Sequence, residues 1–374
     1  MKTVISLIVS AICLCTSGEV QSAPCIMPDI SAECAIVVEM DTGRVIAGKN
    51  ACRRTSMAST TKIMTSLLLC ESGRLDEEIT VTAEMVAVEG SSMGLLAGDR
   101  VHLRDLLFGM MLASGNDAAN VTAITLGGSI EGFANMMNRK AAEIGMTDSH
   151  FVTPSGLDDE HHYTTACDMA RLAVYAMKNE EFAAAAGSKS ATLEYGNPPY
   201  RRTLTNHNRL LGSYDGASGI KTGFTKKSGR CLVSCAERDG VGVIAVTLRD
   251  PNDWADHAVM LDFGFSALRR GTLEVPDIPS LPVYGTGRQV TLAADAPEVS
   301  LLPQDFQSIS CDVSLPAFLC GPITAGQRVG TVKYYYNSCV IASTDIYATH
   351  SVDVRQSGGD NSIITRLLCL IGIK

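Results

Sequence analysis

The chain has 374 residues, of which 46% are hydrophobic, and its formal net charge is -9 at pH 7. This length and composition allow two or three folded domains with sizeable apolar cores, which excludes a wholly disordered chain. The acidic balance comes without any cluster of lysine and arginine. A nucleic-acid backbone needs a basic stripe, so we expect no nucleic-acid partner.

The first 22 residues have the form of a secretory signal peptide. Met1-Lys2 precedes an apolar run over residues 4–14, and Val20-Gln21-Ser22 provides a cleavage signal. The run is too short to span a membrane comfortably. We therefore expect an extracytoplasmic protein that is secreted and membrane-associated. An uncleaved segment that acts as an anchor is the alternative.

Thirteen cysteines are present, and the two in the signal region leave an odd number in the mature chain. At least one must then stay unpaired. Cys70, Cys231 and Cys235 lie in apolar runs, where a free cysteine behaves as a small hydrophobic residue. We expect mostly reduced, buried thiols, while Cys311, Cys320 and Cys339 remain candidates for pairing.

A hairpin and a buried helix are predicted near the start of the mature chain. Two β-rich runs flank a glycine turn within residues 35–47, and apolar residues at helical spacing extend from Ser59 to about Ser72. Ser59 and Lys62 share one face of this helix. A neutral lysine amine there can take the serine proton if burial and nearby cations lower its pKa. The simpler alternative is an N-cap serine followed by a surface lysine.

Two other serines fit nucleophile motifs less well. Ser218 begins a second S-x-x-K, but in a strand-like run its hydroxyl and the lysine face opposite sides. Ser92 lies in a G-x-S-x-G sequence, which makes a nucleophile elbow only between a strand and a helix. Gly98-Asp99 breaks any helix four residues later. We therefore expect neither Ser92 nor Ser218 to be a nucleophile.

Helices are predicted over residues 103–112 and 118–126, and Ser114 and Asn116 lie in the turn between them. Such a turn presents two hydrogen-bonding side chains, although a plain helix cap is the alternative. A further helix is predicted over residues 129–145, and another opens with a capping box at Thr165.

Residues 158–162 carry metal-ligand residue types, in the sequence Asp-Asp-Glu-His-His. Consecutive residues do not converge easily on one ion without ligands from elsewhere. We therefore expect a solvated loop and no metal site.

Three β-like runs, residues 217–224, 229–236 and 241–248, are joined by short turns and predict neighbouring antiparallel strands. The first contains Lys221-Thr222-Gly223. Lys221 and Gly223 share a face, where a glycine lets the backbone of a ligand approach closely. An ordinary edge strand is the alternative. Residues 253–268 then predict a closing helix.

The composition changes after about Arg270, where prolines and glycines punctuate short valine- and tyrosine-rich runs to about Ala348. This pattern is typical of a small all-β domain. In residues 361–374, six aliphatic residues line one helical face with only two positive charges. Such a helix suits a membrane interface, and a final helix docked on the protein is the alternative.

The motifs S-x-x-K, S-x-N and K-T-G follow one another in this order, a set found in penicillin-binding proteins and class A β-lactamases. The chain resembles the low-molecular-weight penicillin-binding proteins that act as serine-type D-alanyl-D-alanine carboxypeptidases. The resemblance runs over nearly the whole chain, including residues 58–65, 114–116, 156–158, 168–170 and 219–225, the small β-domain and the amphipathic tail.

The resemblance implies an α/β fold, with a β-lactamase/transpeptidase-like domain followed by a small all-β domain. The first domain would combine an antiparallel sheet flanked by helices with a helical subdomain. The implied boundaries are residues 1–22 for the signal peptide and 23–271 for the catalytic domain. A β-sandwich-like domain over 272–355 would precede a linker and amphipathic tail over 356–374.

The resemblance also assigns roles in catalysis. Ser59 would be the acylated nucleophile, and Lys62 would be the base that deprotonates it. Ser114 would relay the proton to the leaving D-alanine amine, while Asn116 would hold the substrate amide. The backbone N–H groups of Ser59 and Phe224 would hold the oxyanion.

The K-T-G strand would bind substrate in this resemblance. Lys221 would add positive charge beside Ser114, and Thr222 would help to bind the terminal carboxylate, with Gly223 next to it in the binding strand. Some relatives carry an arginine after this hairpin that binds the substrate carboxylate. Arg249 lies near that position in the sequence, but the motifs do not align it with that arginine. No metal or cofactor is implied.

The implied reaction removes the terminal D-alanine from peptidoglycan stem pentapeptides through an acyl-serine, with β-lactams as covalent inhibitors. A β-lactamase is one alternative, although the chain lacks the E-x-x-L-N run of class A enzymes. A catalytically silent wall-binding or penicillin-sensing protein is another, disfavoured by the intact motif side chains. A D,D-endopeptidase on the same scaffold remains open.

Overall fold

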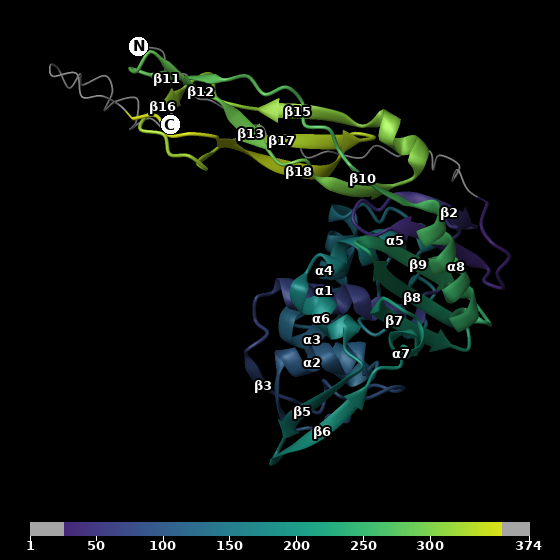
Figure 1. The fold of residues 1–374 in the computed structure, drawn as a ribbon. Helices are drawn as coiled ribbons and strands as arrows, with labels where there is room; N and C mark the ends of the chain where they lie inside the picture. Colours follow the sequence, from purple (N-terminus) through teal and green to yellow (C-terminus); the bar gives the residue numbers. More distant parts are fainter. Residues whose placement is uncertain (1–25, 354–374) are drawn as a thin grey trace, which may run out of the picture. The chain divides into compact units, whose positions relative to one another are not determined.

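The structure is a computed structural model that describes residues 26–353 (Figure 1). The expected signal peptide and amphipathic tail lie outside the described residues. The chain divides into two compact units. The larger unit contains residues up to 38, 45–238 and 243–264, and the smaller unit contains residues 39–44, 239–242 and the chain from 265 onward.

A five-stranded sheet with the order β2-β1-β9-β8-β7 forms the centre of the larger unit. Its strands are β1 (Cys34–Glu39), β2 (Val45–Lys49), β7 (Ala217–Thr225), β8 (Gly229–Arg238) and β9 (Val241–Leu248). β1 pairs with β2 and β7 pairs with β8, both antiparallel. The predicted hairpin and the three predicted neighbouring strands are confirmed.

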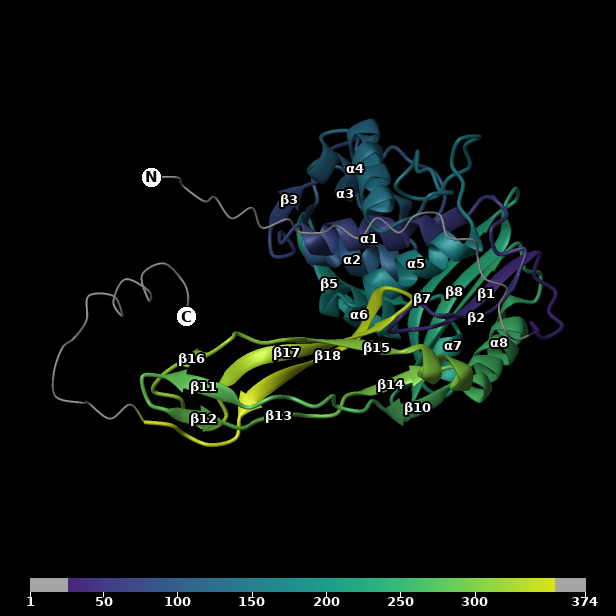
Figure 2. The same ribbon diagram turned by 90° about the horizontal axis from the view of Figure 1, so that it is seen from above.

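Helices cover both faces of this sheet. In Figures 1 and 2, α8 lies on one face, and α1 to α6 gather on the other. A Cβ atom at Gly264 of α8 would lie 2.5 Å from Val243 Cγ1, so the glycine lets this helix pack closely on β9. The helices are η1 (Ala58–Thr61), α1 (Lys62–Glu71), α2 (Leu103–Met111), α3 (Asn116–Gly127), α4 (Ile130–Glu143), α5 (Ala166–Met177), α6 (Glu180–Gly187), α7 (Leu210–Ser213) and α8 (Asp253–Ala267).

The predicted helices are confirmed with small shifts at their ends. The helix expected from Ser59 begins as the 3-10 turn η1 and continues as α1, which ends before the left-handed Gly73. Ser129 caps α4 by accepting a hydrogen bond from the Gly132 N–H. Thr165 caps α5 in the same way, which is one half of the predicted capping box, while the Asp168 carboxylate accepts from the Asp148 N–H and the Ser149 hydroxyl.

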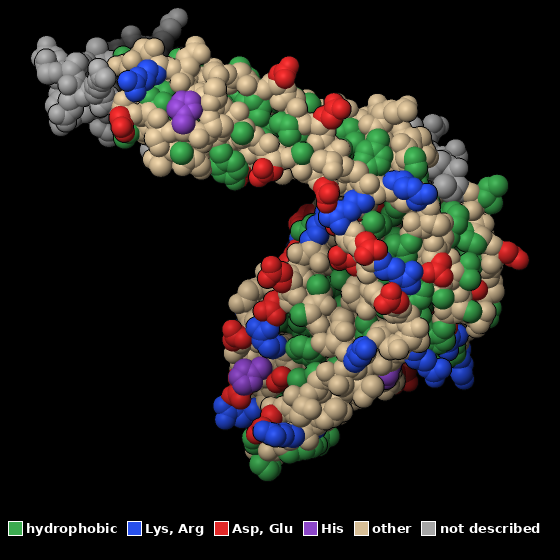
Figure 3. Space-filling view, viewed as in Figure 1, with side chains coloured by type: hydrophobic (Ala, Val, Ile, Leu, Met, Phe, Trp, Pro, Cys, Tyr) green, Lys and Arg blue, Asp and Glu red, His purple; other side chains and the backbone are tan. Residues whose placement is uncertain are grey.

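A second, four-stranded sheet of the larger unit was not predicted. Its order is β3-β4-β5-β6, all pairs being antiparallel, with β3 (Glu78–Thr80), β4 (Arg100–His102), β5 (Ser190–Gly196) and β6 (Pro199–Thr205). On the face seen in Figure 3, acidic and basic side chains are interspersed over the larger unit. Within residues 26–353, no helix has the length and apolar character needed to cross a membrane.

The smaller unit is rich in β-structure, as predicted for the chain after about residue 270. Its sheets have the orders β10-β14, β12-β11-β16 and β13-β18-β17-β15. The strands are β10 (Arg269–Thr272), β11 (Leu281–Tyr284), β12 (Arg288–Val290), β13 (Leu292–Ala294), β14 (Glu298–Leu301), β15 (Ser310–Ser314), β16 (Leu319–Cys320), β17 (Arg328–Tyr336) and β18 (Cys339–Ala348), with the 3-10 helix η2 (Pro303–Ser308) between β14 and β15. Its apolar side chains form two clusters, one around Val290 and one around Val332.

Candidate active site

The predicted pair of Ser59 and Lys62 is in contact. Ser59 lies in η1 and Lys62 opens α1, so the spacing of three residues brings Lys62 Nζ within 3.0 Å of Ser59 Oγ. Ala58, just before the serine, has φ of +46°, a strained value for a residue other than glycine. A Cβ atom at Gly156 would lie 1.9 Å from the Ala58 carbonyl oxygen, so only glycine allows the chain to brace this turn.

Lys62 is completely buried, and its amine has three oxygen neighbours. Besides Ser59 Oγ, it donates to Asn116 Oδ1 at 2.7 Å and to the Ser155 carbonyl oxygen at 2.8 Å. These two oxygens can only accept, whereas a hydroxyl can also donate. A neutral amine that gives its two N–H groups to them therefore directs its lone pair at the Ser59 hydroxyl.

The surroundings of Lys62 favour the neutral amine. Burial holds the pKa of Lys62 well below its usual value, and the positive charge of Lys221 lowers it further, while Asp117 opposes the shift. Burial also lowers the pKa of Lys221, to about 7. Lys62 is thus prepared to accept a proton, as expected of a base that acts near neutral pH.

Ser114 and Asn116 enter the site from the start of α3. Ser114 is nearly buried and has φ of +57°, and its neighbour Gly115 is the N-cap of the helix. Asn116 is the first helical residue, two positions earlier than predicted. Its amide links two segments, because Oδ1 accepts from Lys62 and Nδ2 donates to the Glu89 carbonyl oxygen at 2.7 Å.

The K-T-G strand is β7, and its side chains alternate as predicted. Lys221 and Gly223 are buried, and Phe224 is 65% exposed. The structure adds a second reason for the glycine. A Cβ atom at Gly223 would lie 2.9 Å from the Ser59 backbone nitrogen, so it is η1 that approaches this glycine closely. Lys221 Nζ donates to the Thr222 carbonyl oxygen at 3.0 Å.

A cavity of about 790 Å³ opens at these residues. The two serines of the motifs, Ser59 and Ser114, line it together with three consecutive residues of β7, Thr222, Gly223 and Phe224. Lys62 and Lys221 lie buried behind this surface. The structure therefore gathers the three separate sequence motifs around one open cavity.

The arginine considered from the sequence, Arg249, is not among the residues that line the cavity. Arg249 donates to the Lys227 carbonyl oxygen at 2.7 Å and pairs with Glu33 at 3.4 Å. Arg209 lines the cavity, and so does Arg230 of β8. Its guanidinium is held by Asp253 at 2.9 Å and lies 5.7 Å from the ring centroid of Trp254.

Two known families match the sequence. Residues 19–252 match the family described as D-alanyl-D-alanine carboxypeptidase, which is more than half of the chain. The chain belongs to the D-alanyl-D-alanine carboxypeptidase family. Residues 281–354 match the C-terminal domain of penicillin-binding protein 5.

Individual relatives agree with this membership. The D-alanyl-D-alanine carboxypeptidase DacF of Bacillus subtilis is 31% identical over 343 residues, 87% of each chain. The crystal structure of the carboxypeptidase DacD from Francisella tularensis has a TM-score of 0.63 at 27% identity and covers 87% of this chain and 95% of that one. The crystal structure of the Streptomyces K15 DD-transpeptidase has a TM-score of 0.61 at 32% identity, and the match covers 64% of this chain and 98% of that one.

The family and fold expected from the motifs are thereby confirmed. Membership of the D-alanyl-D-alanine carboxypeptidase family favours the carboxypeptidase over the β-lactamase and the silent wall-binding protein. The match of the smaller unit to a penicillin-binding protein domain agrees with the predicted succession of a catalytic and a β-rich part.

The site of this carboxypeptidase also depends on Asp117, which the motifs did not single out. Its buried carboxylate accepts hydrogen bonds from the Ser92 hydroxyl at 2.6 Å and from the backbone N–H groups of Met93, Gly94 and Leu95 at 2.9 to 3.0 Å. Ser92, in a loop, therefore donates its hydroxyl hydrogen bond to the Asp117 carboxylate of α3, which agrees with its exclusion as a nucleophile. An acidic residue in the first turn of a helix was the available signal.

The loop expected to be solvated over residues 158–162 contains one buried side chain, so that expectation is wrong for His162. Its Nδ1 accepts from the Val152 N–H at 3.0 Å, and its Nε2 lies 2.8 Å from Thr61 Oγ1 in η1. Burial lowers the pKa of His162 to about 4, so the ring is neutral at pH 7 and Nε2 donates to Thr61. Within residues 26–353, no cluster of three metal-ligand side chains forms.

Proposed function

We propose that this protein is a serine-type D-alanyl-D-alanine carboxypeptidase that removes the terminal D-alanine of peptidoglycan stem pentapeptides. The observation that carries the proposal is the 3.0 Å contact between Ser59 Oγ and the buried amine of Lys62, whose two other partners can only accept hydrogen bonds. In the acylation step, Ser59 Oγ attacks the carbonyl carbon of the penultimate D-alanine while Lys62 takes the hydroxyl proton.

The oxyanion of the tetrahedral intermediate would accept hydrogen bonds from the backbone N–H groups of Ser59 and Phe224. The close approach of Gly223 to the Ser59 backbone nitrogen supports this pair, because it brings the backbones of β7 and η1 together. Fixed backbone donors need no reorganisation as negative charge develops, which makes such a pair effective.

The leaving D-alanine amine needs a proton, and we assign its relay to Ser114, with Lys221 supplying positive charge nearby. Both serines line the cavity, and the effect of Lys221 on the pKa of Lys62 supports a shared electrostatic environment. The amide nitrogen of Asn116 has two hydrogens, and the Glu89 carbonyl oxygen takes one of them. The second is then available for a substrate carbonyl.

The terminal carboxylate of the substrate would be bound by Thr222 and Arg230. Thr222 and Arg230 both line the cavity, and Asp253 with Trp254 fixes the guanidinium. Arg249 is directed at Lys227 and Glu33, so we assign no substrate contact to it. A guanidinium fits a carboxylate through paired N–H donors, which favours a chain-terminal residue in this site.

Release of D-alanine from a stem-pentapeptide mimic tests the proposed reaction. The purified protein should release one D-alanine per peptide, and penicillin should block this by acylating the peptide that contains Ser59. Ser59→Ala should abolish both activities, while the matched variant Ser92→Ala should keep acylation. A penicillin adduct on Ser92 or Ser218 would overturn the site assignment, and cleavage only of cross-linked peptides would indicate a D,D-endopeptidase.

We also propose that the enzyme is exported by residues 1–22 and held at the membrane surface by residues 356–374. Burial of six aliphatic residues can supply several kcal/mol at about 25 cal/mol per Å², less the cost of ordering the tail. Deletion after Gly359 should move the protein to the soluble fraction and keep activity on soluble peptide. Loss of activity or of folding would instead indicate a tail docked on the protein.

A further inference from the structure

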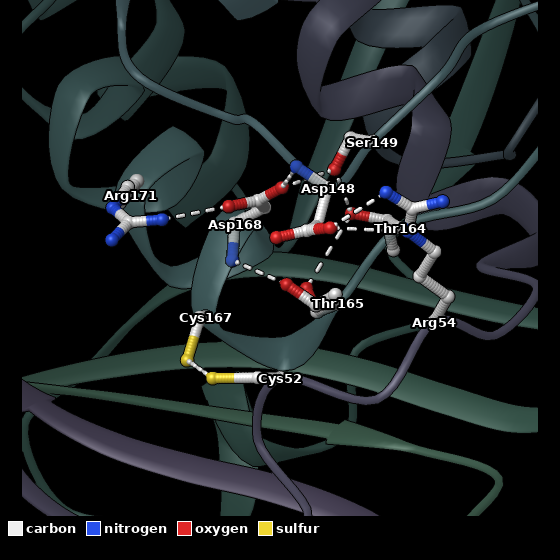
Figure 4. A network of polar contacts seen from close by, with 9 residues as sticks. All are labelled: Cys52, Arg54, Asp148, Ser149, Thr164, Thr165, Cys167, Asp168 and Arg171. Carbon is white, nitrogen blue, oxygen red and sulfur yellow. Dashed lines mark hydrogen bonds and ion pairs between the residues drawn. The ribbon is translucent and has the colours of Figure 1, made fainter. Parts of the chain in front are cut away.

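The larger unit contains a pair of cysteine side chains that the proposed reaction does not use. Cys52 lies in the loop after β2, and Cys167 lies in the first turn of α5. Their Sγ atoms are 3.4 Å apart and point toward each other (Figure 4). Cys52 is exposed, while Cys167 is 7% exposed. The geometry points to Cys52 and Cys167 as a reversible disulfide pair.

The backbone holds the two cysteines together independently of their sulfur atoms. The Cys167 N–H donates to the Ala51 carbonyl oxygen at 3.0 Å, and Thr55 and Thr164 form an antiparallel bridge with bonds of 2.8 and 2.9 Å. The segments 51–55 and 164–167 are therefore bonded to each other on both sides of the thiols. A disulfide needs an S–S distance of about 2.05 Å, so the two sulfur atoms must move closer than their present 3.4 Å for the bond to form.

Other buried cysteines have different surroundings. Cys235 Sγ lies 3.2 Å from the Ser218 hydroxyl, and Cys231 Sγ lies 3.9 Å from the Ser56 carbonyl oxygen. These thiols are in the sheet, where an oxidant has no access. Cys52 and Cys167, in contrast, line a cavity of about 950 Å³ that opens between residues 26–30 and the loop after β2.

The oxidant that balances the reaction is a small-molecule disulfide. The Cys52 thiolate attacks it to form a mixed disulfide and releases one thiol, and the Cys167 sulfur then attacks the mixed disulfide and releases the second thiol. Burial raises the pKa of Cys167 to about 12, so Cys167 loses its proton only in the second step. Two cysteine thiols are oxidised, and one disulfide is reduced to two thiols.

The crosslink would stabilise segments that support the active site without changing the cavity that binds substrate. The loop that carries Cys52 leads directly into η1 and Ser59. In Figure 4, α5 also holds Asp168, whose carboxylate accepts from the Asp148 N–H at 2.9 Å and from the Ser149 hydroxyl at 2.8 Å. The bond joins positions 115 residues apart, which restrains the unfolded chain strongly.

The experiment compares full-length protein treated with oxidised glutathione or with dithiothreitol. Peptide mapping without reduction should link the Cys52 peptide to the Cys167 peptide, with a mass loss of two hydrogen atoms. The oxidised form should melt roughly 5–10 °C higher and lose its penicillin acylation activity more slowly on heating. Both differences should disappear in Cys52→Ser and persist in the matched variant Cys311→Ser, which alters an exposed cysteine of the smaller unit.

Two outcomes would overturn the inference. One is a stable glutathione adduct on Cys52 with no link to Cys167, because the buried sulfur would then not resolve the mixed disulfide. The other is a link between Cys52 and a different cysteine. Cys52→Ser alters an exposed side chain and leaves the backbone bonds of Ala51 and Thr55 intact, so its folding provides a sound reference.

Discussion

Lys62 and Lys221 of the larger unit and Arg44 of the smaller unit hold positive charge in opposite ways. In the larger unit, Lys62 and Lys221 are at most 1% exposed, and neither has an ion pair within residues 26–353. In the smaller unit, the guanidinium of Arg44 is bonded to Asp305, with Nε 2.7 Å from Oδ2, and Tyr336 donates to the other carboxylate oxygen at 2.7 Å. The first arrangement yields amines that can lose a proton, whereas the second yields a fixed charge.

The pKa shifts follow this difference. Burial lowers the pKa of both lysines, because a charged amine without a carboxylate bonded to it is poorly stabilised there. Burial acts on Arg44 in the same direction, but the hydrogen bond and charge of Asp305 outweigh it and raise the pKa of the guanidinium. An unpaired buried cation is therefore a sign of chemistry, and a paired one is a sign of structure.

The largest effect is expected for Lys62→Arg, which keeps a cation at the position but removes a group able to lose its proton. Acylation by penicillin should fall by a factor of about 10³ or more, as for loss of a general base. Stopped-flow or mass-spectrometric acylation rates measure this. Lys140→Arg is the matched control, since Lys140 is already paired with Glu71 and Glu143 at 3.0 and 2.7 Å. Near-normal acylation by the Lys62 variant would remove this residue from the mechanism.

Asp305→Ala tests the paired cation of the smaller unit. It leaves the partly buried Arg44 guanidinium without its carboxylate, so the free energy of unfolding of this unit should fall by about 3 kcal/mol, and acylation at Ser59 should not change. Calorimetry and denaturant unfolding measure the loss. Asp312→Ala, at an exposed position of β15, is the control. If the Asp305 variant is as stable as the control, the ion pair is not structural.

Lys221→Met should change stability in the opposite direction and raise the free energy of unfolding by about 2 kcal/mol at pH 7. The same variant should lose acylation. The folded-state pKa is about 7, against 10.5 ordinarily, so the unfolded chain binds more protons between these pH values. The stability of the unmodified protein should therefore rise from pH 7 to about 10.5, and the gain should shrink over that window. A variant less stable than the parent at pH 7 would contradict the unpaired-charge argument.

Local periodicity predicted most of what positions the site. The contact of Ser59 with Lys62 follows from helical spacing, and the alternation of β7 follows from strand geometry. These features depend on residues close together in the chain. The assembly of β3 to β6 into one sheet was missed because the pairing that joins its two halves, Arg100 of β4 with Gly196 of β5, spans about 100 residues, although β5 and β6 form a local hairpin.

The unpredicted parts of the site are also long-range contacts. Asp117 acts on a loop about 25 residues earlier, and His162 reaches Thr61 across about 100 residues. Arg230 rather than Arg249 lines the cavity, although both lie near the ends of adjacent strands. Which of two such side chains faces a cavity depends on the partners that hold them, here Asp253 and Glu33, and no spacing rule encodes those partners.

His162→Gln should have the smallest effect at neutral pH, because this buried group of the larger unit carries no charge there. Loss of its hydrogen bonds should cost about 1 kcal/mol at pH 7, with Gln able to replace the donor to Thr61 in part. Below pH 6.5 the difference in the free energy of unfolding between the parent and the variant begins to reverse. The folded-state pKa is about 4, so between pH 6.5 and 4 the unfolded chain takes up a proton that folded His162 does not. The parent loses this part of its stability as the pH falls.

The variant lacks that loss, so it should become the more stable protein by about pH 4.5. Urea unfolding at pH 7, 5.5 and 4.5 measures the crossing. His161→Gln, which alters the exposed neighbouring histidine, should run parallel to the parent at all three values. Parallel curves for the His162 variant would mean that this ring titrates normally in the folded state. The argument that burial without a charged partner shifts a pKa would then rest on Lys62 and Lys221 alone.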